Sequence, residues 1–507
     1  MNIMNKITSA FLGLTTITGL PAQSTQHPNI IYVFPDQFRN SAMQFWSENG
    51  FSQQVRFKAD PVITPHLNQF AREAVVLTSA QSNCPLSSPH RGMLLTGLYP
   101  DGNGVMLNCN DTRPISNLKQ DVMAISDVLS QNGYDCAYIG KLHVDYPTKN
   151  NPQNPGTYVE DRNPVWDAFT PEERRHGFNF WYSYGTFDEH KNPHYWDSKN
   201  NRHDPKEWSP VHEAGKAIEY LTGIRDKSKP FFLMVSMNPP HSPYNSPDDC
   251  QEKDFDLYKN IPLMKLLVRP NVNQSFKSRM ANAPYYFASV TGVDREFGRI
   301  LATLKELGLD KNTIVVFSSD HGETLASHVE DAKNSPYAEA MNVPFLIRYP
   351  GKLKPHVTGL LLSTPDIMPT LLSLAGLKNS IPAGVQGHDL SSELSRKKPS
   401  VNAPKAVLYI QNLDGMKNAE GKVISYFPGA RGVKTDRYTL AIFIDRKKQL
   451  KQVMLFDDVK DPYQMHNLPV EQNKKLFQSL CRLMPDLLKN ANDPWYRERI
   501  LSGIIPY

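Results

Sequence analysis

Five apolar runs between residues 29 and 348 constrain the fold more than any other feature of this chain. Each run is long enough for one buried strand, and helical periodicity lies between them. The clearest helix carries Val290, Val293, Phe297, Ile300 and Leu304 at intervals of three and four. We therefore predict an α/β fold, in which a large mixed, mostly parallel sheet is flanked by helices. The five runs are residues 29–34, 137–140, 231–237, 313–319 and 343–348.

Two other parts of the chain have a different character. Residues 146–209 are rich in Asn, Pro, His and aromatic residues, which predicts a long ordered insertion within a catalytic domain of residues 27–391. After residue 391, short β-like pieces at 405–410, 437–444 and 452–456 precede a helix that begins at Glu471. Pro485 should split that helix. We predict that residues 392–507 form a separate small α+β subdomain.

The N-terminus is typical of a signal peptide. Lys6 precedes an apolar stretch of residues 7–20, and small residues follow, so we expect residues 1–22 to direct export. The stretch is too short to span a bilayer, and no later segment is apolar enough to predict a transmembrane helix. The net charge of +5 comes without long basic runs, so a nucleic-acid partner is not indicated. Cys84 and Cys109 could form a disulfide; buried free thiols are the alternative.

Ser87 stands at a position suited to chemistry on an anion. It lies two residues before Pro89 and four before Arg91, where a helix is expected to begin. A helix start offers free N–H groups and a positive dipole, and Arg91 one turn on can point back toward Ser87. The alternative is that Ser87 is an ordinary helix cap.

Polar residues follow several of the predicted strands. Asp36 and Gln37 come after the first run, and Asp320 and His321 come after residues 313–319. Because parallel strand ends meet at one edge of a sheet, these donors can converge on one cation, and oxygen ligands with one imidazole suit calcium. The same ends also carry Lys141, His143 and His241, and Lys333 follows further along the chain.

Taken in order, these motifs resemble the sulfatase family. Its signature reads Cys or Ser, any residue, Pro, any residue and Arg, followed by a Leu-Thr-Gly run, as in residues 87–97 here. The resemblance extends from residue 29 to residue 468 and implies an alkaline-phosphatase-like fold with a short antiparallel C-terminal sheet. It also implies one Ca²⁺ bound by Asp36, Gln37, Ser87, Asp320 and His321. Gln37 departs from the family's usual Asp.

The resemblance further implies a mechanism. Ser87 would be converted to formylglycine (3-oxoalanine) by an anaerobic radical maturation enzyme, and the aldehyde hydrate would attack sulfur. Arg91, Lys141 and Lys333 would bind the anionic groups, His143 would take a proton from the sulfated hydrate, and His241 would serve the leaving oxygen. The chain is most similar to exported bacterial enzymes, which implies a periplasmic location.

A sulfated carbohydrate, either a glycan or a sugar of glycosaminoglycan type, is the expected substrate. Aromatic, His and Asp residues at 185–196 suit sugar rings and hydroxyls. Two alternatives stay open: a phosphate or phosphonate ester hydrolase of the same superfamily, and an inactive protein that only binds sulfated glycans. Four further side chains could contact the substrate, with purely structural roles as the alternative: Arg113, His190, His194 and His388.

Overall fold

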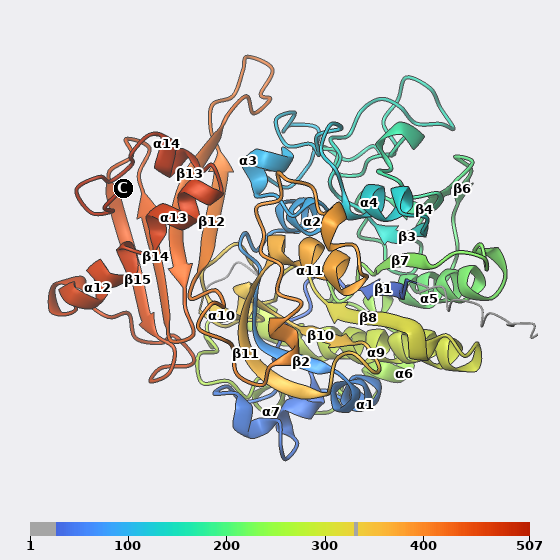
Figure 1. The fold of residues 1–507 in the computed structure, drawn as a ribbon, viewed down its shortest axis with the longest axis horizontal. Coiled ribbons are helices and arrows are strands. Elements are labelled where there is room, and N and C mark those ends of the chain that lie inside the picture. Colours follow the sequence, from blue (N-terminus) through green and yellow to red (C-terminus); the bar gives the residue numbers. More distant parts are fainter. Residues whose placement is uncertain (1–26, 329–332) are drawn as a thin grey trace, which may run out of the picture.

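The computed structural model describes residues 27–328 and 333–507, so the predicted signal peptide at residues 1–22 lies outside the described residues. A large mixed sheet runs through the main body of the molecule (Figure 1). Its centre consists of parallel neighbours in the order β8, β1, β7, β3 and β4. These strands are Thr313–Ser318, Asn29–Val33, Phe231–Ser236, Asp135–Lys141 and Phe180–Tyr184.

One side of this sheet is antiparallel in part. The run 343–348 was expected to be one buried parallel strand, and this prediction is wrong. Pro344, which has no N–H for a sheet ladder, separates β9 (Asn342–Val343) from β10 (Phe345–Arg348). β10 lies antiparallel between β8 and β2 (Val75–Gln81), and β11 (His356–Ser363) forms the edge parallel to β2.

Alternate side chains of the central strands face two separate cores. Ile31 and Val33 of β1 pack with α1, α5 and α9, whereas Ile30 and Tyr32 pack with α2, α4 and α11. Figure 1 shows these helices on the two faces of the sheet, which confirms the predicted α/β architecture. The first group is Pro65–Glu73, Ser209–Glu219 and Ala283–Glu306, and the second is Ser87–Thr96, Ile125–Gln131 and Ile367–Leu374.

The insertion at residues 146–209 contains regular structure that we did not expect. β4, β5 (Tyr195–Asp197) and β6 (Arg202–His203) extend the sheet beyond β3. The rings of Tyr182 and Tyr195 stack across β4 and β5 with centroids 4.8 Å apart. The insertion therefore fixes its loops onto the sheet instead of lying loosely over it. Short helices elsewhere are α3 Pro100–Asn103, α6 Glu252–Phe255, α7 Leu263–Leu266, α8 Lys277–Ala281 and α10 Ala338–Met341.

The C-terminal region has its own four-stranded antiparallel sheet, seen at the left of Figure 1, as the resemblance implied. Pro485 lies in the first turn of α13, so the predicted split of the C-terminal helix is confirmed. The boundary after residue 391 stays a prediction. The strands are β12 Val407–Asp414, β13 Tyr426–Lys434, β14 Tyr438–Ile444 and β15 Leu450–Asp457, and the helices are α12 Lys474–Cys481, α13 Met484–Asn490 and α14 Pro494–Arg497.

Two expectations about the whole chain can be compared with the structure. Within residues 27–328 and 333–507, no helix is both long and apolar enough to cross a membrane. All five cysteines are buried free thiols, so Cys84 and Cys109 follow the second of the two alternatives above.

Candidate functional site

The ends of β1 and β8 are joined by hydrogen bonds from the side chain of Ser319. Its hydroxyl donates to the carbonyl of Pro35 at 2.8 Å and accepts from the N–H of Phe38 at 3.0 Å. The N–H of Gln37 donates to Asp320 Oδ1 at 3.0 Å. These bonds hold the polar residues that follow the two strands against each other.

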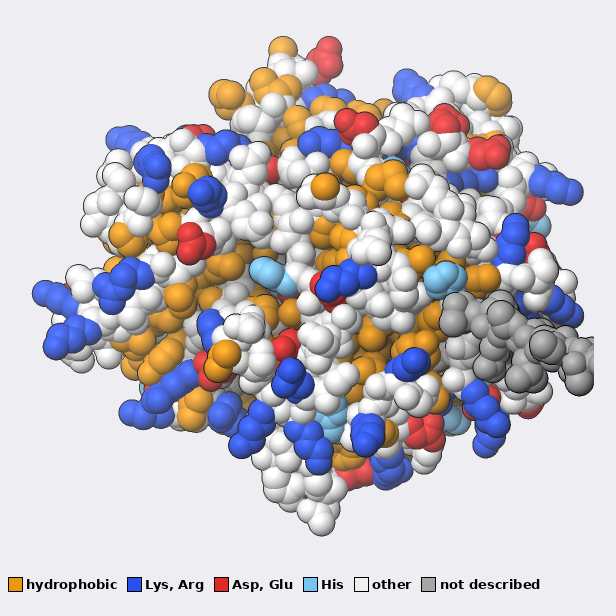
Figure 2. All heavy atoms as spheres, in the orientation of Figure 1, with side chains coloured by type: hydrophobic (Ala, Val, Ile, Leu, Met, Phe, Trp, Pro, Cys, Tyr) orange, Lys and Arg blue, Asp and Glu red, His pale blue; other side chains and the backbone are white. Residues whose placement is uncertain are grey.

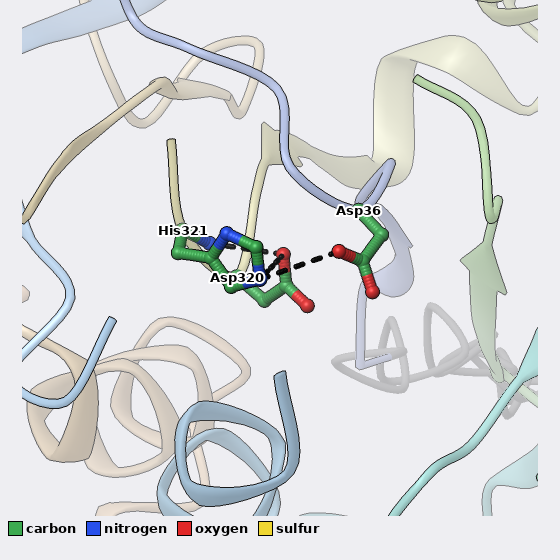
Figure 3. Close-up of side chains that lie close together, drawn as sticks. All are labelled: Asp36, Asp320 and His321. Carbon is green, nitrogen blue, oxygen red and sulfur yellow. Dashed lines mark hydrogen bonds and ion pairs between the residues drawn. The ribbon is translucent and has the colours of Figure 1, made fainter. Parts of the chain in front are cut away.

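Asp36, Asp320 and His321 form the centre of the site. One ligand atom from each lies within 4.8 Å of the others, and all three are fully buried (Figure 3). Asp36 Oδ1 has no hydrogen-bond partner among the described residues and lies 3.4 Å from His321 Nε2. A buried carboxylate oxygen without a donor is costly unless a cation binds it. The donor set therefore fits a hard divalent cation.

Gln37 is held so that its amide oxygen faces the cluster. Its Nε2 donates to Glu323 Oε2, and Tyr244 donates to the same carboxylate at 2.7 Å. The amide oxygen is thereby left for Lys333 Nζ, 3.1 Å away. The backbone of Gln37 is left-handed, with φ of 63°, a conformation that residues other than glycine rarely adopt. Glu323 thus explains how a glutamine can present an oxygen where the family usually has an aspartate.

Ser87 is the first residue of α2 and does not cap it. Leu86 occupies the capping position, and the Ser87 hydroxyl lies 3.1 Å from His321 Nε2. Every residue of α2 is buried, and the exposed fraction of Ser87 is 1%. The helix therefore presents this hydroxyl to the cluster of Asp36, Asp320 and His321.

Arg91 binds the acidic residues and not Ser87. Its guanidinium donates to Asp36 Oδ2 at 3.1 Å, to Asp320 Oδ2 at 3.2 Å and to the carbonyl of Lys141 at 2.8 Å. Burial would lower the pKa of Arg91, but Asp320 and Asp36 raise it above its usual value. Among the described residues Arg91 forms no hydrogen bond to Ser87, because these buried carboxylates take up its donors. Arg91 positions both acids.

Lys141 lies at the end of β3 and reaches the same carboxylate. Its Nζ is 2.7 Å from Asp36 Oδ2 and donates to Asn238 Oδ1 at 3.0 Å. Gly140, with φ of 94°, precedes it, and a Cβ there would lie 2.0 Å from the carbonyl of Ser236. Only glycine allows β3 and β7 to approach this closely where the lysine leaves the strand.

His143 lies near Lys141, and one of its ring nitrogens has no hydrogen-bond partner among the described residues. Nε2 contacts the carbonyl of Cys109 at 3.2 Å, and the buried Nδ1 has no partner among the described residues. Burial and then the charge of Lys141 hold the pKa of His143 well below its usual value, so the ring is neutral and can accept a proton. No direct contact joins His143 to Ser87 in the described part of the chain. Its backbone φ of 52° is also left-handed.

Lys333 and His241 close the other side of the site. Lys333 Nζ lies 2.9 Å from His241 Nε2 and 3.2 Å from His321 Nε2. Burial lowers the pKa of Lys333; Asp36 opposes this change, and Lys141 adds to it. His241 Nδ1 lies 2.7 Å from the carbonyl of Ser242 and 3.4 Å from Asp188 Oδ1. The sequence-predicted catalytic groups are thus brought into one region.

The cations around Asp36 decide its charge. Burial alone would raise the pKa of this carboxyl, but Lys141, His241 and Arg91 hold it well below the usual range. Asp36 is therefore ionised at any physiological pH. The site combines carboxylates that could hold a metal ion with buried cations, an arrangement suited to binding an anion beside such an ion.

The four weaker candidates lie in different surroundings. His190 and His194 are buried: His190 Nε2 contacts the carbonyl of His241 at 2.9 Å, and His194 Nε2 contacts Asp167 at 2.7 Å. These contacts suit structural roles behind the site. His388 lies beside Asp366, and no hydrogen bond or ion pair joins it to the cluster in the described ranges. Arg113 is half-buried and pairs with Asp414 of β12 at 2.9 Å.

Three residues that we did not predict also belong to the site. Asn238 links Lys141 to Asp188, whose carboxylate accepts from Asn238 Nδ2 at 3.1 Å. Asn238 directly follows an apolar run, so the rule that selected Asp36 could have found it. Trp166 lies between His143, at a ring distance of 6.4 Å, and Arg113, whose guanidinium carbon is 5.8 Å from its ring. Nothing in its local pattern pointed there.

The chain is similar in sequence to several known proteins. Residues 28–377 match the family described as Sulfatase, and residues 331–491 match N-sulphoglucosamine sulphohydrolase, C-terminal. The chain is 62% identical over 491 residues to an Endo-4-O-sulfatase of Bacteroides thetaiotaomicron, with 96% of each protein covered. It is 33% identical to an Ulvan-active sulfatase of Formosa agariphila, with 87% of this chain and 77% of the relative covered.

A solved structure has the same fold as this chain. It comes from work on glycosaminoglycan metabolism by Bacteroides thetaiotaomicron and matches with a TM-score of 0.94 at 63% identity. The match covers 95% of this chain and 100% of the other. Both regions of the molecule are therefore shared with that structure.

Proposed function

Because this chain belongs to the sulfatase family, we propose that it removes 4-O-sulfate groups from within a sulfated glycan chain of glycosaminoglycan type. The relative with 62% identity, named Endo-4-O-sulfatase, supports the position and the endo action. The observation that carries the proposal is the Ser87 hydroxyl, 3.1 Å from His321 Nε2 and beside buried carboxylates and lysines. We also propose export to the periplasm, on the basis of residues 1–22.

Two groups complete the proposed site. Asp36, Gln37, Asp320, His321 and residue 87 would hold Ca²⁺, which supplies Lewis-acid polarisation of a sulfate oxygen. Formylglycine at position 87, made from Ser87 by an anaerobic maturation enzyme, supplies a hydrate as the nucleophile. The unpartnered Asp36 Oδ1 and the amide oxygen of Gln37 support the metal part of this proposal.

The chain's own residues supply the remaining chemistry. Lys141 and Lys333 place ammonium groups where charge develops on the sulfuryl and leaving oxygens. His143 is neutral, with Nδ1 free to accept a proton from residue 87 after transfer. His241, whose Nε2 accepts from Lys333, would lie at the leaving oxygen together with that ammonium, which can donate a proton. Arg91 keeps the two carboxylates in place.

Substitution of Ser87 tests this function. We expect Ser87→Ala to abolish turnover of a sulfated oligosaccharide and to retain affinity for it, because the cations remain. The matched control is Ser88→Ala, since Ser88 Oγ only accepts from the N–H of Cys109 at 3.0 Å, and it should keep turnover. Mass spectrometry of the wild-type peptide from the native host should show two hydrogens fewer at residue 87. Wild-type turnover by Ser87→Ala, or phosphate ester hydrolysis faster than sulfate ester hydrolysis, would contradict the proposal.

A further inference from the structure

A groove lined by basic residues lies along the edge of the main sheet, apart from the reaction centre. It encloses about 800 Å³ between β11 and the start of β14, and none of its lining residues belongs to the site described above. We call it the basic groove, defined by its cationic lining residues Arg56, Lys397, Lys398, Lys405 and Arg437. Its only acidic lining residue is Asp436.

Three of these cations have no carboxylate to neutralise them. Among the described residues, Arg56, Lys397 and Lys398 are exposed and form no ion pair, whereas Arg437 pairs with Asp457 at 2.8 Å. A second hollow of about 480 Å³ shares both lysines, and its further cation, Arg72, pairs with Glu48 at 2.7 Å. Figure 2 shows Lys and Arg side chains gathered on the lower part of this face, where Figure 1 places β11, β2 and α1. The uncompensated positive charge therefore extends along the groove.

The rest of the lining suits a carbohydrate. Thr78, Ser79 and Thr435 supply hydroxyls, Gln54 supplies an amide, and Tyr438 supplies an aromatic ring. Hydroxyl and amide groups exchange hydrogen bonds with sugar hydroxyls, and an aromatic face packs on a sugar ring. A groove with several cations but one aromatic side chain is a poor match for single-stranded nucleic acid, whose binding relies on repeated base stacking.

We propose that the basic groove is a second, non-catalytic binding site for a sulfated polysaccharide. This inference rests on the proposed function, because only an enzyme that acts on a long polyanion gains from holding it at a distance from the reaction centre. Two attachment points convert the second binding event into an intramolecular one, which raises the overall affinity for a long chain. A short substrate cannot reach both sites and gains nothing.

The competing explanation is protection of a sheet edge. Among the described strands β11 pairs only with β2 and is therefore an edge strand, and lysines near such an edge prevent pairing with another molecule. The two explanations differ in their consequences. Edge protection predicts self-association when the cations are removed, whereas a binding site predicts weaker binding of the polyanion by a protein that stays monodisperse.

The experiment compares two triple variants that lose the same charge. One removes groove cations, as Arg56→Ser, Lys397→Ser and Lys398→Ser. The control removes exposed, unpaired lysines of the C-terminal region, as Lys451→Ser, Lys474→Ser and Lys475→Ser. Each is made in the Ser87→Ala protein for binding to long dextran sulfate, and in the wild-type protein for turnover of a short sulfated oligosaccharide. Light scattering follows association.

We expect the groove variant to bind dextran sulfate at least about tenfold more weakly than the control. The slope of its affinity against salt should be smaller by about two, since roughly 0.7 of a counterion is released per contact with a flexible polyanion. Turnover of the short oligosaccharide should be unchanged in both. Equal affinity of the two variants, self-association of the groove variant, or tighter binding of DNA than of dextran sulfate by the wild type would each overturn the proposal. If the wild-type protein showed no sulfatase activity, the proposed function would be refuted. The comparison of the two variants in dextran sulfate binding would still test the groove.

Discussion

The reaction centre and the basic groove both collect cations, but in opposite surroundings. In the centre, Arg91 and Lys141 have side chains 1% exposed, and each contacts Asp36. In the groove, Arg56, Lys397 and Lys398 are exposed and lack carboxylate partners in the described parts of the chain. A buried charge must be paired, and pairing fixes its position. An exposed charge is screened by salt and keeps its freedom, so it can attract a polymer without orienting a reacting group.

The largest expected effect concerns the buried pairs. Arg91→Met removes a guanidinium that pairs with two buried carboxylates, so we expect the free energy of unfolding to fall by about 3–5 kcal/mol. Arg56→Met in the groove should leave the denaturation midpoint unchanged. Urea denaturation of both variants measures the contrast. Equal midpoints for the two variants would show that the buried Arg91 contributes no more to stability than the exposed Arg56.

Lys333 sharpens the comparison, because it is half-buried yet pairs with no carboxylate among the described residues. Its contacts are His241, His321 and Gln37. We expect Lys333→Met to lower turnover by about 10²–10³-fold, the loss typical of one group that stabilises developing charge, while the unfolding free energy stays unchanged. Steady-state kinetics and urea denaturation on the same preparation test this. A loss of stability as large as that of Arg91→Met would assign Lys333 a structural role.

The smallest of the three effects depends on pH. Glu339 is buried and accepts from Arg269 Nη2 at 2.8 Å. Burial alone would raise the pKa of this carboxyl, but Arg269 and His328 hold it below its usual 4.5. Its stabilisation is therefore complete above pH 4.5 and is lost as the pH falls below that value. Glu339→Gln should cost about 1.5–3 kcal/mol at pH 7.

Measuring unfolding of wild type and Glu339→Gln between pH 3 and 7 tests the sign. The difference between the two proteins should shrink as the solution becomes more acidic. A difference that stayed constant or grew toward low pH would show that the carboxylate is not stabilised by these cations.

The sequence predicted those parts of the molecule that follow a local rule. Asp36 and Asp320 were found because polar residues after apolar runs gather at one edge of a parallel sheet. β4 was missed because Phe180–Tyr184 lies in an Asn- and Pro-rich region, although its aromatic residues favour a strand. β13 was missed because Pro428 and Gly429 indicate a turn.

Contacts between distant segments could not be predicted. The sequence indicated no role for Glu323, because its orientation of Gln37 depends on a fold that brings residues 37, 244 and 323 together. Trp166 beside His143 is another such case. The same applies to the basic groove, whose cations come from residues 56, 397–405 and 437. Net charge did not reveal it, because the positive residues are scattered in sequence and gathered only in space.

The burial of Ser87 has a consequence for the order of events during synthesis. With 1% of its surface exposed, on a helix whose ten residues are all buried, this side chain is out of reach of any other protein's active site once the chain has folded. If Ser87 is converted as proposed, the maturation enzyme would have to act on the nascent or unfolded polypeptide. Folding faster than this modification would then leave a well-formed but inert protein, and the supply of active enzyme would be set by a race that ends when α2 packs into the interior.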